Sequence, residues 1–285
     1  MPRIEVFAPA KVNLALHVTG RRADGYHLLD SLVAFAPFGD RLWLEPGAAS
    51  LTVTGPEAAG VPDGPGNLVL RAAALAGGAA RIVLQKNLPA ASGIGGGSSD
   101  AAAALRGLAA MGFALPKGTE GLGADVPMCL VPRPARARGI GADLEPVALP
   151  PLPAVLVNPR VEVATPAVFR ALTCRENPSL PEIPPAGTVD FIDWLSLQRN
   201  DLEPPAMAIA PVIYTVLATL RATPGCRLAR MSGSGATCFA LYATEAEAEA
   251  ALTRIRVAHP SWWSACGVLG DQSAAATAQR TRSTT

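Results

Sequence analysis

The sequence predicts an α+β fold, and two kinds of periodic pattern carry that prediction. Residues 11–18 alternate apolar and polar side chains, which is the period of a half-buried strand. Residues 99–110 and 244–260 instead repeat apolar side chains at helical spacing. With 49% hydrophobic residues in 285, the chain can bury a sizeable core. Both halves are therefore expected to combine strands with helices.

The chain is expected to open with an antiparallel sheet. In the first strand the even positions are apolar, so Lys11, Asn13 and His17 share the other face. Asp24 and Gly25 form a D-G pair, which favours a hairpin turn after that strand. Further strands are expected at 28–36, 41–45 and 51–54.

Helices and strands then alternate up to a proline-rich stretch. Asn67 is placed to cap a helix over 67–76, and a strand is expected at 81–86. Residues 124–131 are typical of a short helical turn that leads into a buried strand. The stretch 145–159 is rich in proline and marks the expected domain boundary. These patterns define an N-terminal domain over residues 1–152.

A C-terminal domain is expected over residues 153–270. Thr165 and Pro166 are typical of an N-cap and the first helical residue, and they predict a helix over 165–172. The T-x-x-E pattern at Thr244 predicts a capped helix that stops at Pro260. Other expected elements are a buried helix in 204–220, kinked or started at Pro211, and strands at 226–231, 237–242 and 264–269. Residues 271–285 lack an apolar period and are expected to form a flexible tail.

Charge and cysteine content narrow the expected class of protein. Lysine plus arginine number 24 and aspartate plus glutamate 23, so no strong field favours nucleic acid or an anionic membrane. Small molecules are the expected partners, and the chain is expected to be a monomer or a weak homodimer. No signal peptide or membrane span is expected. Cysteines occur singly at 129, 174, 226, 238 and 266, which predicts free thiols and a cytoplasmic location.

The most distinctive stretch is NLPAASGIGGGSSDAAAALRGL, residues 87–108, in which a glycine-rich loop precedes an alanine-rich helix. The first N–H groups of a helix lack internal partners and carry the positive end of its dipole, so they attract phosphate. Side chains at 93 and 95–97 would obstruct a triphosphate lying against this backbone. The common signatures G-x-x-x-x-G-K-[ST] and G-x-G-x-x-G after a strand are absent from the sequence. A loop that merely turns tightly is the alternative.

Three stretches resemble the motifs of the GHMP kinases, a family named for galactokinase and for the homoserine, mevalonate and phosphomevalonate kinases. They are PAKVNLALHVTGRRADGYHLLDSL at 9–32, the glycine loop, and RMSGSGATCFALY at 230–242. LGADVPMCL at 122–130 and RNDLE at 199–203 are also similar to family sequences. The likeness covers roughly residues 4–270. The joint presence of DGYH and GADVP is more specific than the glycine loop alone.

The resemblance implies both a fold and an activity. The implied fold has an N-terminal domain similar to the second domain of ribosomal protein S5 and a C-terminal ferredoxin-like domain, with substrate between them. The implied phosphoryl donor is ATP. The likeness is greatest to a branch whose substrate is a cytidine diphosphate ester of methylerythritol, phosphorylated on its 2-hydroxyl in non-mevalonate isoprenoid (terpenoid) biosynthesis.

Two residues match the catalytic pair of the family. Asp125 in GADVP matches the aspartate that orients the acceptor hydroxyl and takes its proton. Lys11 matches a lysine that would keep this carboxylate ionised and stabilise charge on the transferred phosphate. The alternatives are a helix cap for Asp125 and a solvated strand-edge position for Lys11. Asn13, on the same strand face as Lys11, is expected to hold a substrate hydroxyl.

A second group matches the cytidine site of the family. Tyr26 offers an aromatic face for the base, and His27 can bond the edge of the base. Phe169 resembles the second aromatic of a base sandwich, with Thr165 close to it, although ordinary core packing explains Phe169 as well.

The ATP site is expected to involve the glycine loop and Mg²⁺. Asn67 resembles a residue near the adenine in relatives, though an N-cap role explains it equally well. Mg²⁺ is expected because it bridges phosphate oxygens in kinases, and Ser99 is the candidate ligand. SGSGAT at 232–237 is expected to support the substrate side, while His17 and His259 are interpreted as structural. The expected ATP-binding residues are Asn67, Pro89, Gly93, Gly95, Gly96, Gly97, Ser98 and Ser99.

One departure from the family and three alternative functions stay open at this point. The connection over 111–127 is about ten residues shorter than in relatives, which leaves the placement of Asp125 uncertain. Another GHMP kinase, acting on a sugar, an amino acid or a mevalonate derivative, is one alternative, and DGYH with Phe169 argues for cytidine instead. A ligand sensor without catalysis is opposed by Lys11 and Asp125, and an RNA-binding module by the near-zero net charge.

Overall fold

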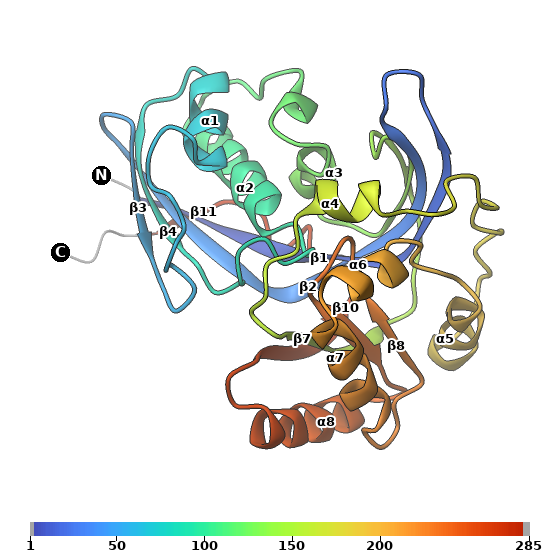
Figure 1. Cartoon of the computed structure of the whole chain (residues 1–285). Helices are drawn as coiled ribbons and strands as arrows, with labels where there is room; N and C mark the ends of the chain where they lie inside the picture. Colours follow the sequence, from blue (N-terminus) through green and yellow to red (C-terminus); the bar gives the residue numbers. More distant parts are fainter. Residues whose placement is uncertain (1–2, 282–285) are drawn as a thin grey trace.

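The computed structural model describes residues 3–281 and contains two β-sheets. The larger sheet has seven strands and contains a path in the order β11-β1-β2-β4-β3, with β5 paired to β2 and β6 paired to β5. The smaller sheet has four strands in the order β10-β7-β9-β8. Figure 1 shows the larger sheet crossing the middle of the molecule, with α1, α2 and α3 on one side and the smaller sheet on the other. The predicted α+β class is confirmed.

Two long antiparallel strands form the backbone of the larger sheet. They are β1, Arg3–Arg21, and β2, His27–Pro46, joined by the predicted hairpin turn. The strands expected separately at 28–36 and 41–45 are therefore one continuous strand. β1 carries irregularities in its pairing with β2 between Pro9 and Lys11, between Asn13 and Ala15, and between Val18 and Gly20. Such bulges re-aim side chains, so strict alternation along β1 fails.

The remaining N-terminal elements complete this sheet and cover it. The strands are β3 (Ser50–Thr54), β4 (Ala80–Gln85), β5 (Ala135–Gly139) and β6 (Asp143–Pro146). The helices are α1 (Leu68–Leu75), α2 (Gly96–Ala110) and α3 (Val126–Leu130), with a 3-10 turn η1 at Thr119–Gly121. The expected sheet is not purely antiparallel, because β3 pairs with β4 in parallel.

Small residues let α2 lie close against the larger sheet. Its buried face is formed largely by alanines from 101 to 104, which belong to the main core cluster. A Cβ atom added at Gly107 would stand 2.5 Å from Leu44 Cδ1 and 3.2 Å from Val6 Cγ2. A larger residue at 107 would therefore push the helix off the sheet and shift its N-terminus, where the glycine loop ends.

The C-terminal half builds the smaller sheet and most of the remaining helices. Its strands are β7 (Leu152–Asn158), β8 (Leu228–Met231), β9 (Cys238–Leu241) and β10 (Trp263–Leu269). Its helices are α4 (Thr165–Arg170), α5 (Thr188–Ser196), α6 (Glu203–Ile209), α7 (Val212–Arg221) and α8 (Glu245–Ala258). The helix expected in 204–220 is thus two helices, with Pro211 as the N-cap of the second. The helix is interrupted at Pro211 because proline has no backbone N–H to donate to a helical hydrogen bond.

Two of the three predicted helix caps are confirmed. The Asn67 side chain accepts a hydrogen bond from Val69 N, and Thr244 forms a full capping box with Glu247. Thr165 is not a cap: Ala164 occupies the N-cap position, and the Thr165 hydroxyl lies 2.7 Å from Ser234 Oγ. A tertiary hydrogen bond has replaced the local one that the sequence favours.

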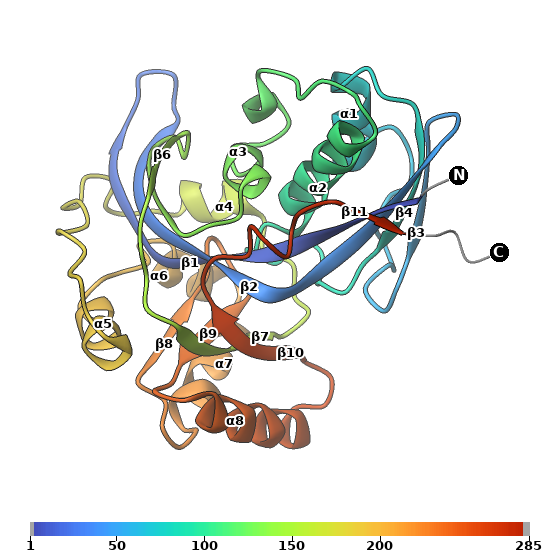
Figure 2. The ribbon, with the colours of Figure 1, turned by 180° about the vertical axis from the view of Figure 1, so that it is seen from behind.

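The residues expected to form a flexible tail are ordered as far as the structure describes them. After β10 the chain returns to the larger sheet, where β11 (Gln279–Thr281) pairs with the start of β1. Figure 2 shows this return from behind, with β11 lying beside β1. Ala276 is buried, and Arg106 of α2 donates a hydrogen bond to its carbonyl. Pairing with a distant strand and one buried side chain hold this segment although it has no apolar period. Residues 282–285 of the expected tail lie outside the described residues.

Two further expectations concern membranes and thiols. Between residues 3 and 281, the structure contains no helix that is both long enough and apolar enough to span a bilayer. The five cysteines are free thiols, and two of them, Cys129 and Cys238, are buried. Burial raises the pKa of the Cys129 thiol to about 12, so this thiol stays protonated near neutral pH.

Candidate active site

A cavity of about 1200 Å³ lies where the β1–β2 hairpin, the glycine loop, α3 and α4 meet. All but one of the site residues predicted from the sequence line it. The cavity combines an apolar wall with a few polar side chains, as small-molecule sites commonly do. From the hairpin and β1 come Lys11, Asn13, Tyr26 and His27; from the loops and helices come Asn67, Pro89, Gly93, Gly95, Gly96, Gly97, Ser98, Asp125, Thr165 and Phe169.

The glycine loop opens the start of α2 into this cavity. Gly95 is the N-cap residue, with φ at +67°, and no side chain caps the helix. Ser99 N–H makes the first bond of the helix, to Gly95 O at 2.8 Å. The N–H groups of residues 96 to 98 precede that bond and lie at the positive end of a helix of 15 residues. This arrangement can receive phosphate oxygens.

Close contacts explain why the loop needs glycine. A Cβ at Gly95 would lie 3.1 Å from Lys11 Cε, and a Cβ at Gly93 would lie 2.6 Å from Ser232 O. Conversely, a Cβ at Gly233 would lie 2.9 Å from Gly93 O. The predicted turn at 232–237 therefore packs directly on the first glycine loop. Ser232 links the two, because its hydroxyl donates to Gly93 O and accepts from Asn13 N.

Lys11 and Asp125 form an ion pair in the cavity, with Nζ 2.9 Å from Oδ2. The Lys11 side chain is 5% exposed, whereas that of Asp125 is 35% exposed and open to an incoming molecule. Asp125 occupies the N-cap position of α3 but makes no side-chain capping bond. The carboxylate thus points to Lys11 rather than to its own helix. The short connection over 111–127 still brings Asp125 to this position.

A chain of hydrogen bonds fixes the lysine and the asparagine beside it. Lys11 Nζ donates to Asn13 Oδ1 at 2.8 Å, and Asn13 Nδ2 donates to Ser31 Oγ at 2.8 Å. The Ser31 hydroxyl in turn donates to Ala15 O. The expected face of Lys11, Asn13 and His17 ends at Asn13, because β1 has an irregularity between Asn13 and Ala15. His17 instead accepts from Arg199 N and lies 3.1 Å from Pro178 O, which supports its structural interpretation.

Beneath the glycine loop lies a buried charge cluster that sequence reasoning missed. Lys86 donates hydrogen bonds to Asp40 and to Asp100, the latter at 2.8 Å. Asp40 also accepts from the N–H groups of Asn87 and Leu88, which hold the first residues of the loop. All three charged side chains are buried. One lysine thus anchors β2, the start of the loop and the first turn of α2.

The buried cluster holds two carboxylates and one ammonium, which shifts their protonation. Burial, opposed by Lys86 and reinforced by Asp40, raises the pKa of Asp100 to about 8. The two carboxylates raise the pKa of Lys86 against the opposing effect of its burial. Asp100 Oδ1 is buried without a hydrogen-bond partner among the described residues. The sequence contains one hint of this cluster, the position of Asp100 in the first turn of a helix. That position explains a favourable interaction with the helix dipole, but it does not indicate a contact with Lys86.

Ser99 does not take the place predicted for it. Its side chain is buried and donates to Pro9 O at 2.8 Å, so it ties α2 to β1 and does not line the cavity. The helix turns about 100° per residue, and this turn sends Ser99 to the sheet while Ser98 faces the cavity. Ser98 is therefore the hydroxyl available to a phosphate or a cation. Within residues 3–281 no group of three His, Cys, Asp or Glu side chains forms a ready metal site.

Two other predicted residues line the part of the cavity next to α1. Asn67 accepts from Val69 N, and its Nδ2 donates to Pro62 O, so its side chain holds the entrance of α1. The N-cap interpretation of Asn67 is thus confirmed. Its proximity to a nucleotide base remains a prediction. Pro89 follows the residues held by Asp40 and lines the same cavity.

The aromatic residues meet in a different pairing from the one expected. His27 stacks on Phe169, with ring centroids 4.8 Å apart and an angle of 25° between the planes. Tyr26 is 65% exposed at the hairpin turn. Burial, together with Arg21 and Arg175, lowers the pKa of His27 and favours its neutral form. His27 Nε2 is buried and has no hydrogen-bond partner among the described residues.

Comparison with known proteins relates this arrangement to one family. The sequence profile of the GHMP kinases N terminal domain matches residues 67–131, and that of the GHMP kinases C terminal domain matches residues 189–260. The 4-diphosphocytidyl-2-C-methyl-D-erythritol kinase of Dinoroseobacter shibae is 62% identical over 269 residues, covering 92% of this chain and 94% of that protein. The protein of the same name from Paracoccus denitrificans is 57% identical, covering 92% and 95%.

Solved structures agree with these sequence matches. A crystal structure of 4-(cytidine 5'-diphospho)-2C-methyl-D-erythritol kinase superimposes with a TM-score of 0.77 at 40% identity, covering 93% of this chain and 99% of that one. Homoserine kinase from Cytophaga hutchinsonii, at 19% identity, superimposes with a TM-score of 0.66 over 98% and 97% of the chains. The second likeness shows the fold alone.

The fold and the cavity define a kinase for small molecules, a phosphotransferase that acts on a hydroxyl group. Kinases of this kind use ATP. The chain belongs to the GHMP kinases, within the family of the 4-diphosphocytidyl-2-C-methyl-D-erythritol kinases.

Proposed function

We propose that this chain transfers the γ-phosphoryl group of ATP to the 2-hydroxyl of 4-diphosphocytidyl-2-C-methyl-D-erythritol, a step in isoprenoid biosynthesis. The observation that carries the proposal is the ion pair of Lys11 and Asp125, 2.9 Å apart, beside the open start of α2. A Cβ at Gly95 would lie 3.9 Å from Asp125 Oδ2. Carboxylate, ammonium and helix N-terminus thus border one small volume in which an alcohol can meet a phosphate.

Asp125 and Lys11 have separate roles in this proposal. Asp125, the more exposed of the two, orients the acceptor hydroxyl and takes its proton as the bond to phosphorus forms. Lys11 holds the carboxylate in place and offsets negative charge on the transferring group. Asn13 fixes Lys11 through its own bond to Ser31, so the ammonium is already oriented before substrate arrives. Asn13 also lines the cavity, where it can bond a substrate hydroxyl.

ATP fits the glycine cradle, because the loop leaves no side chain between the cavity and the N–H groups at 96 to 98. Gly93, Gly95, Gly96 and Gly97 would wrap the phosphates, while Asn67 and Pro89 lie where the nucleoside would extend. We propose Mg²⁺ as the companion of ATP, since it commonly binds substrate phosphates and few protein oxygens. Ser98 is the hydroxyl that would hold it. Bound Mg²⁺ would neutralise charge between the β- and γ-phosphates.

The cytidine end would lie between the hairpin and α4. Tyr26 offers an exposed ring to stack on the base, and Phe169 offers a second aromatic face nearby. Neutral His27, with its unpartnered Nε2, would bond the edge of the base. Thr165, bonded to Ser234 of the second glycine turn, would support the diphosphate side.

Three further expectations remain part of the proposal. The domain boundary near residue 152 is supported by the strands, since β1 to β6 belong to the larger sheet and β7 to β10 to the smaller one. A cytoplasmic location is supported by the free cysteines. A monomer or weak homodimer is proposed as the assembly state.

A coupled assay of ADP release with a panel of alcohols tests the proposal. We expect turnover with 4-diphosphocytidyl-2-C-methyl-D-erythritol and competition by cytidine 5'-diphosphate. Homoserine, mevalonate and galactose should give at least about a hundredfold lower kcat/KM, because they leave the polar groups of the base site unpaired. Phosphorus NMR of the product identifies the new phosphate ester. Comparable turnover of a substrate without cytidine, unaffected by cytidine 5'-diphosphate, would contradict the proposed substrate.

A further inference from the structure

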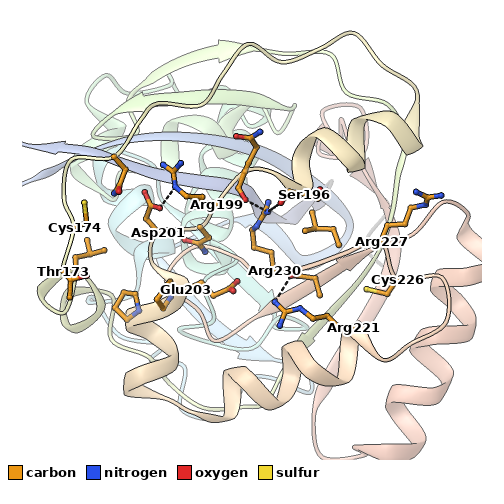
Figure 3. A pocket seen from close by; sticks show the side chains of 18 residues that line it. Thr173, Cys174, Ser196, Arg199, Asp201, Glu203, Arg221, Cys226, Arg227 and Arg230 are labelled. Carbon is orange, nitrogen blue, oxygen red and sulfur yellow. Dashed lines mark hydrogen bonds and ion pairs between the residues drawn. The ribbon is translucent and has the colours of Figure 1, made fainter.

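A second cavity, of about 640 Å³, lies on the C-terminal half of the molecule, among the 172–177 segment, α6, the end of α7 and β8. Figure 3 shows its lining side chains. Four arginines and two carboxylates line it: Arg199, Arg221, Arg227, Arg230, Asp201 and Glu203. Its volume is within the range of sites that hold small organic ligands. The proposed kinase reaction uses none of these side chains.

Three of the four arginines already have hydrogen-bond or ion-pair partners within the protein. Arg230 is buried and donates to the carbonyls of Leu14, Leu195 and Gln198. Arg199 pairs with Asp201 at 2.8 Å. Arg227 pairs with a surface carboxylate that lies outside the cavity lining. The guanidinium groups of Arg230 and Arg199 are therefore committed to the protein itself, whereas Arg227 is held by an exposed ion pair of 3.3 Å.

Arg221 differs from the other three. Among the described residues the Arg221 side chain makes one hydrogen bond, a long one of 3.5 Å from Nη2 to Ala229 O, and has no carboxylate within 4 Å. Figure 3 shows its guanidinium directed toward Arg230 and Glu203, while Arg227 extends away from them. Burial lowers the pKa of Arg230 to about 10, with Glu203 opposing that effect and Arg221 adding to it.

The cavity also has aliphatic lining residues. Leu172, Pro204, Pro205 and Leu228 line it. Charged and aliphatic side chains in one cavity call for a ligand with both properties. Arginine binds phosphate through a planar fork of donors, which makes a phosphate group the best match for Arg221.

We propose that this cavity is a second ligand site, which binds a small organic phosphate or diphosphate with a short apolar group, and that its occupancy is coupled to the active site. Arg221 bonds the phosphate, and the leucine and proline side chains cover the apolar group. The site is separate from the glycine cradle.

The coupling is argued from a wall that the two cavities share, the segment 199–203. Asn200 faces the second cavity and donates from Nδ2 to Met231 O and Gly233 O, both at 2.8 Å. Asp201 accepts from Val18 N of β1 at 2.7 Å. Gly233 and Leu202 line the active-site cavity. A ligand that displaces this segment therefore changes the support of the second glycine turn and of β1, the strand that carries Lys11.

Titration calorimetry with 3-methylbutyl diphosphate, in the presence of a saturating non-hydrolysable ATP analogue, tests the site. The analogue blocks the glycine cradle. Arg221→Met should weaken binding at least about tenfold, since it removes charge-assisted hydrogen bonds. Arg221→Lys keeps the charge without the fork and should fall between the two. Arg254→Met, an exposed arginine of α8 outside the cavity, should bind as the wild type does.

Inorganic diphosphate represents the charged half of the ligand, and 3-methylbutanol represents its apolar half. Each compound alone should bind at least about fivefold more weakly than the ester. Equal binding of the ester by Arg221→Met and by the wild type, both folded by thermal melting, would overturn the site. Binding of inorganic diphosphate as tight as that of the ester would overturn the assigned ligand class.

The coupling has its own measurement. The dissociation constant of the ATP analogue is measured with and without saturating 3-methylbutyl diphosphate. Direct competition at the glycine cradle would change this dissociation constant equally in the wild type and in Arg221→Met. Coupling through the second site should therefore make the change in the wild type at least about threefold larger than the change in Arg221→Met. Equal changes in the two proteins would overturn the coupling.

Discussion

Two lysines contact adjacent residues of the glycine loop, and each forms ion pairs with one or two carboxylates. Lys11 lies against Gly95 and pairs with Asp125, which is one-third exposed to the cavity. Lys86 lies against Gly96 and is enclosed between Asp40 and Asp100, both buried. The same chemical pair thus occurs once in an open and once in a sealed environment. The difference separates a group that can meet a substrate from one that holds the loop in shape.

Replacing each lysine by methionine tests this comparison most strongly. Lys86→Met leaves two buried carboxylates without their cation and should lower the free energy of unfolding by about 3–5 kcal/mol. Lys11→Met should cost far less stability, because water can reach Asp125, but should lower kcat at least about a hundredfold. Urea unfolding and the ADP-release assay measure the two effects. A loss of unfolding free energy of equal size in both variants would contradict the distinction between an open and a sealed ion pair.

The sealed cluster should also make stability depend on pH. The pKa of Asp100 is raised to about 8 in the folded protein, while an unfolded aspartate titrates near 3.8. Between these values the folded state binds the extra proton, so stability falls as pH rises, by up to about 1.4 kcal/mol per pH unit. Above about pH 8 both states are ionised and this contribution is constant.

Asp100→Asn keeps the shape of the neutral carboxyl and removes its titration. The difference in unfolding free energy between wild type and Asp100→Asn should therefore decline from pH 5 to pH 8. Urea unfolding at four pH values in this range measures it. A difference that does not change with pH would contradict a protonated Asp100 in the cluster.

Gly95, next to the open pair, offers a smaller test. Gly95→Ala places a side chain at φ +67° and 3.1 Å from Lys11 Cε, and should raise the KM for ATP about tenfold. Gly77 is a matched control, because its φ is +61° and nothing lies within 4 Å of an added Cβ. Gly77→Ala should lose similar stability, about 1–2 kcal/mol, with an unchanged KM. Equal KM values in the two variants would argue against the cradle.

The smallest expected effect concerns the hairpin. Tyr26→Ala should raise the KM for the cytidine substrate about tenfold with little change in kcat, because base stacking contributes to binding and not to chemistry. Tyr214 of α7 is 65% exposed, as Tyr26 is, but lies outside the cavity. Tyr214→Ala should therefore behave as wild type in the ADP-release assay. A similar KM in both variants would remove Tyr26 from the base site.

Local patterns of the sequence predicted the open pair better than the sealed cluster. The hairpin, the capped helices and the glycine loop depend on neighbouring residues, which is why Asn67 and Thr244 were identified as caps. The juxtaposition of Lys11 and Asp125 followed from the family motifs. Asp40 of β2 and Lys86, the residue after β4, meet across 46 positions of the chain because β2 pairs with β4, and no local pattern specifies that pairing.

Three further details were decided by tertiary contacts. Ser99 looked like its neighbour Ser98, but the helix directs it to Pro9 on the sheet. The segment expected as a tail is ordered through β11, whose pairing with β1 depends on backbone bonds and not on apolar spacing. The strand face containing His17 was interrupted by an irregularity in β1, which alternation alone cannot reveal.

Single-turnover kinetics of Asp125→Asn test the central claim most directly, because they separate phosphoryl transfer from binding and product release. With ATP and 4-diphosphocytidyl-2-C-methyl-D-erythritol bound, the rate of phosphoryl transfer should fall about a hundredfold to ten-thousandfold, while the dissociation constant of ATP stays within about twofold. Transfer at the wild-type rate in a folded Asp125→Asn protein would contradict the role assigned to the Lys11–Asp125 pair.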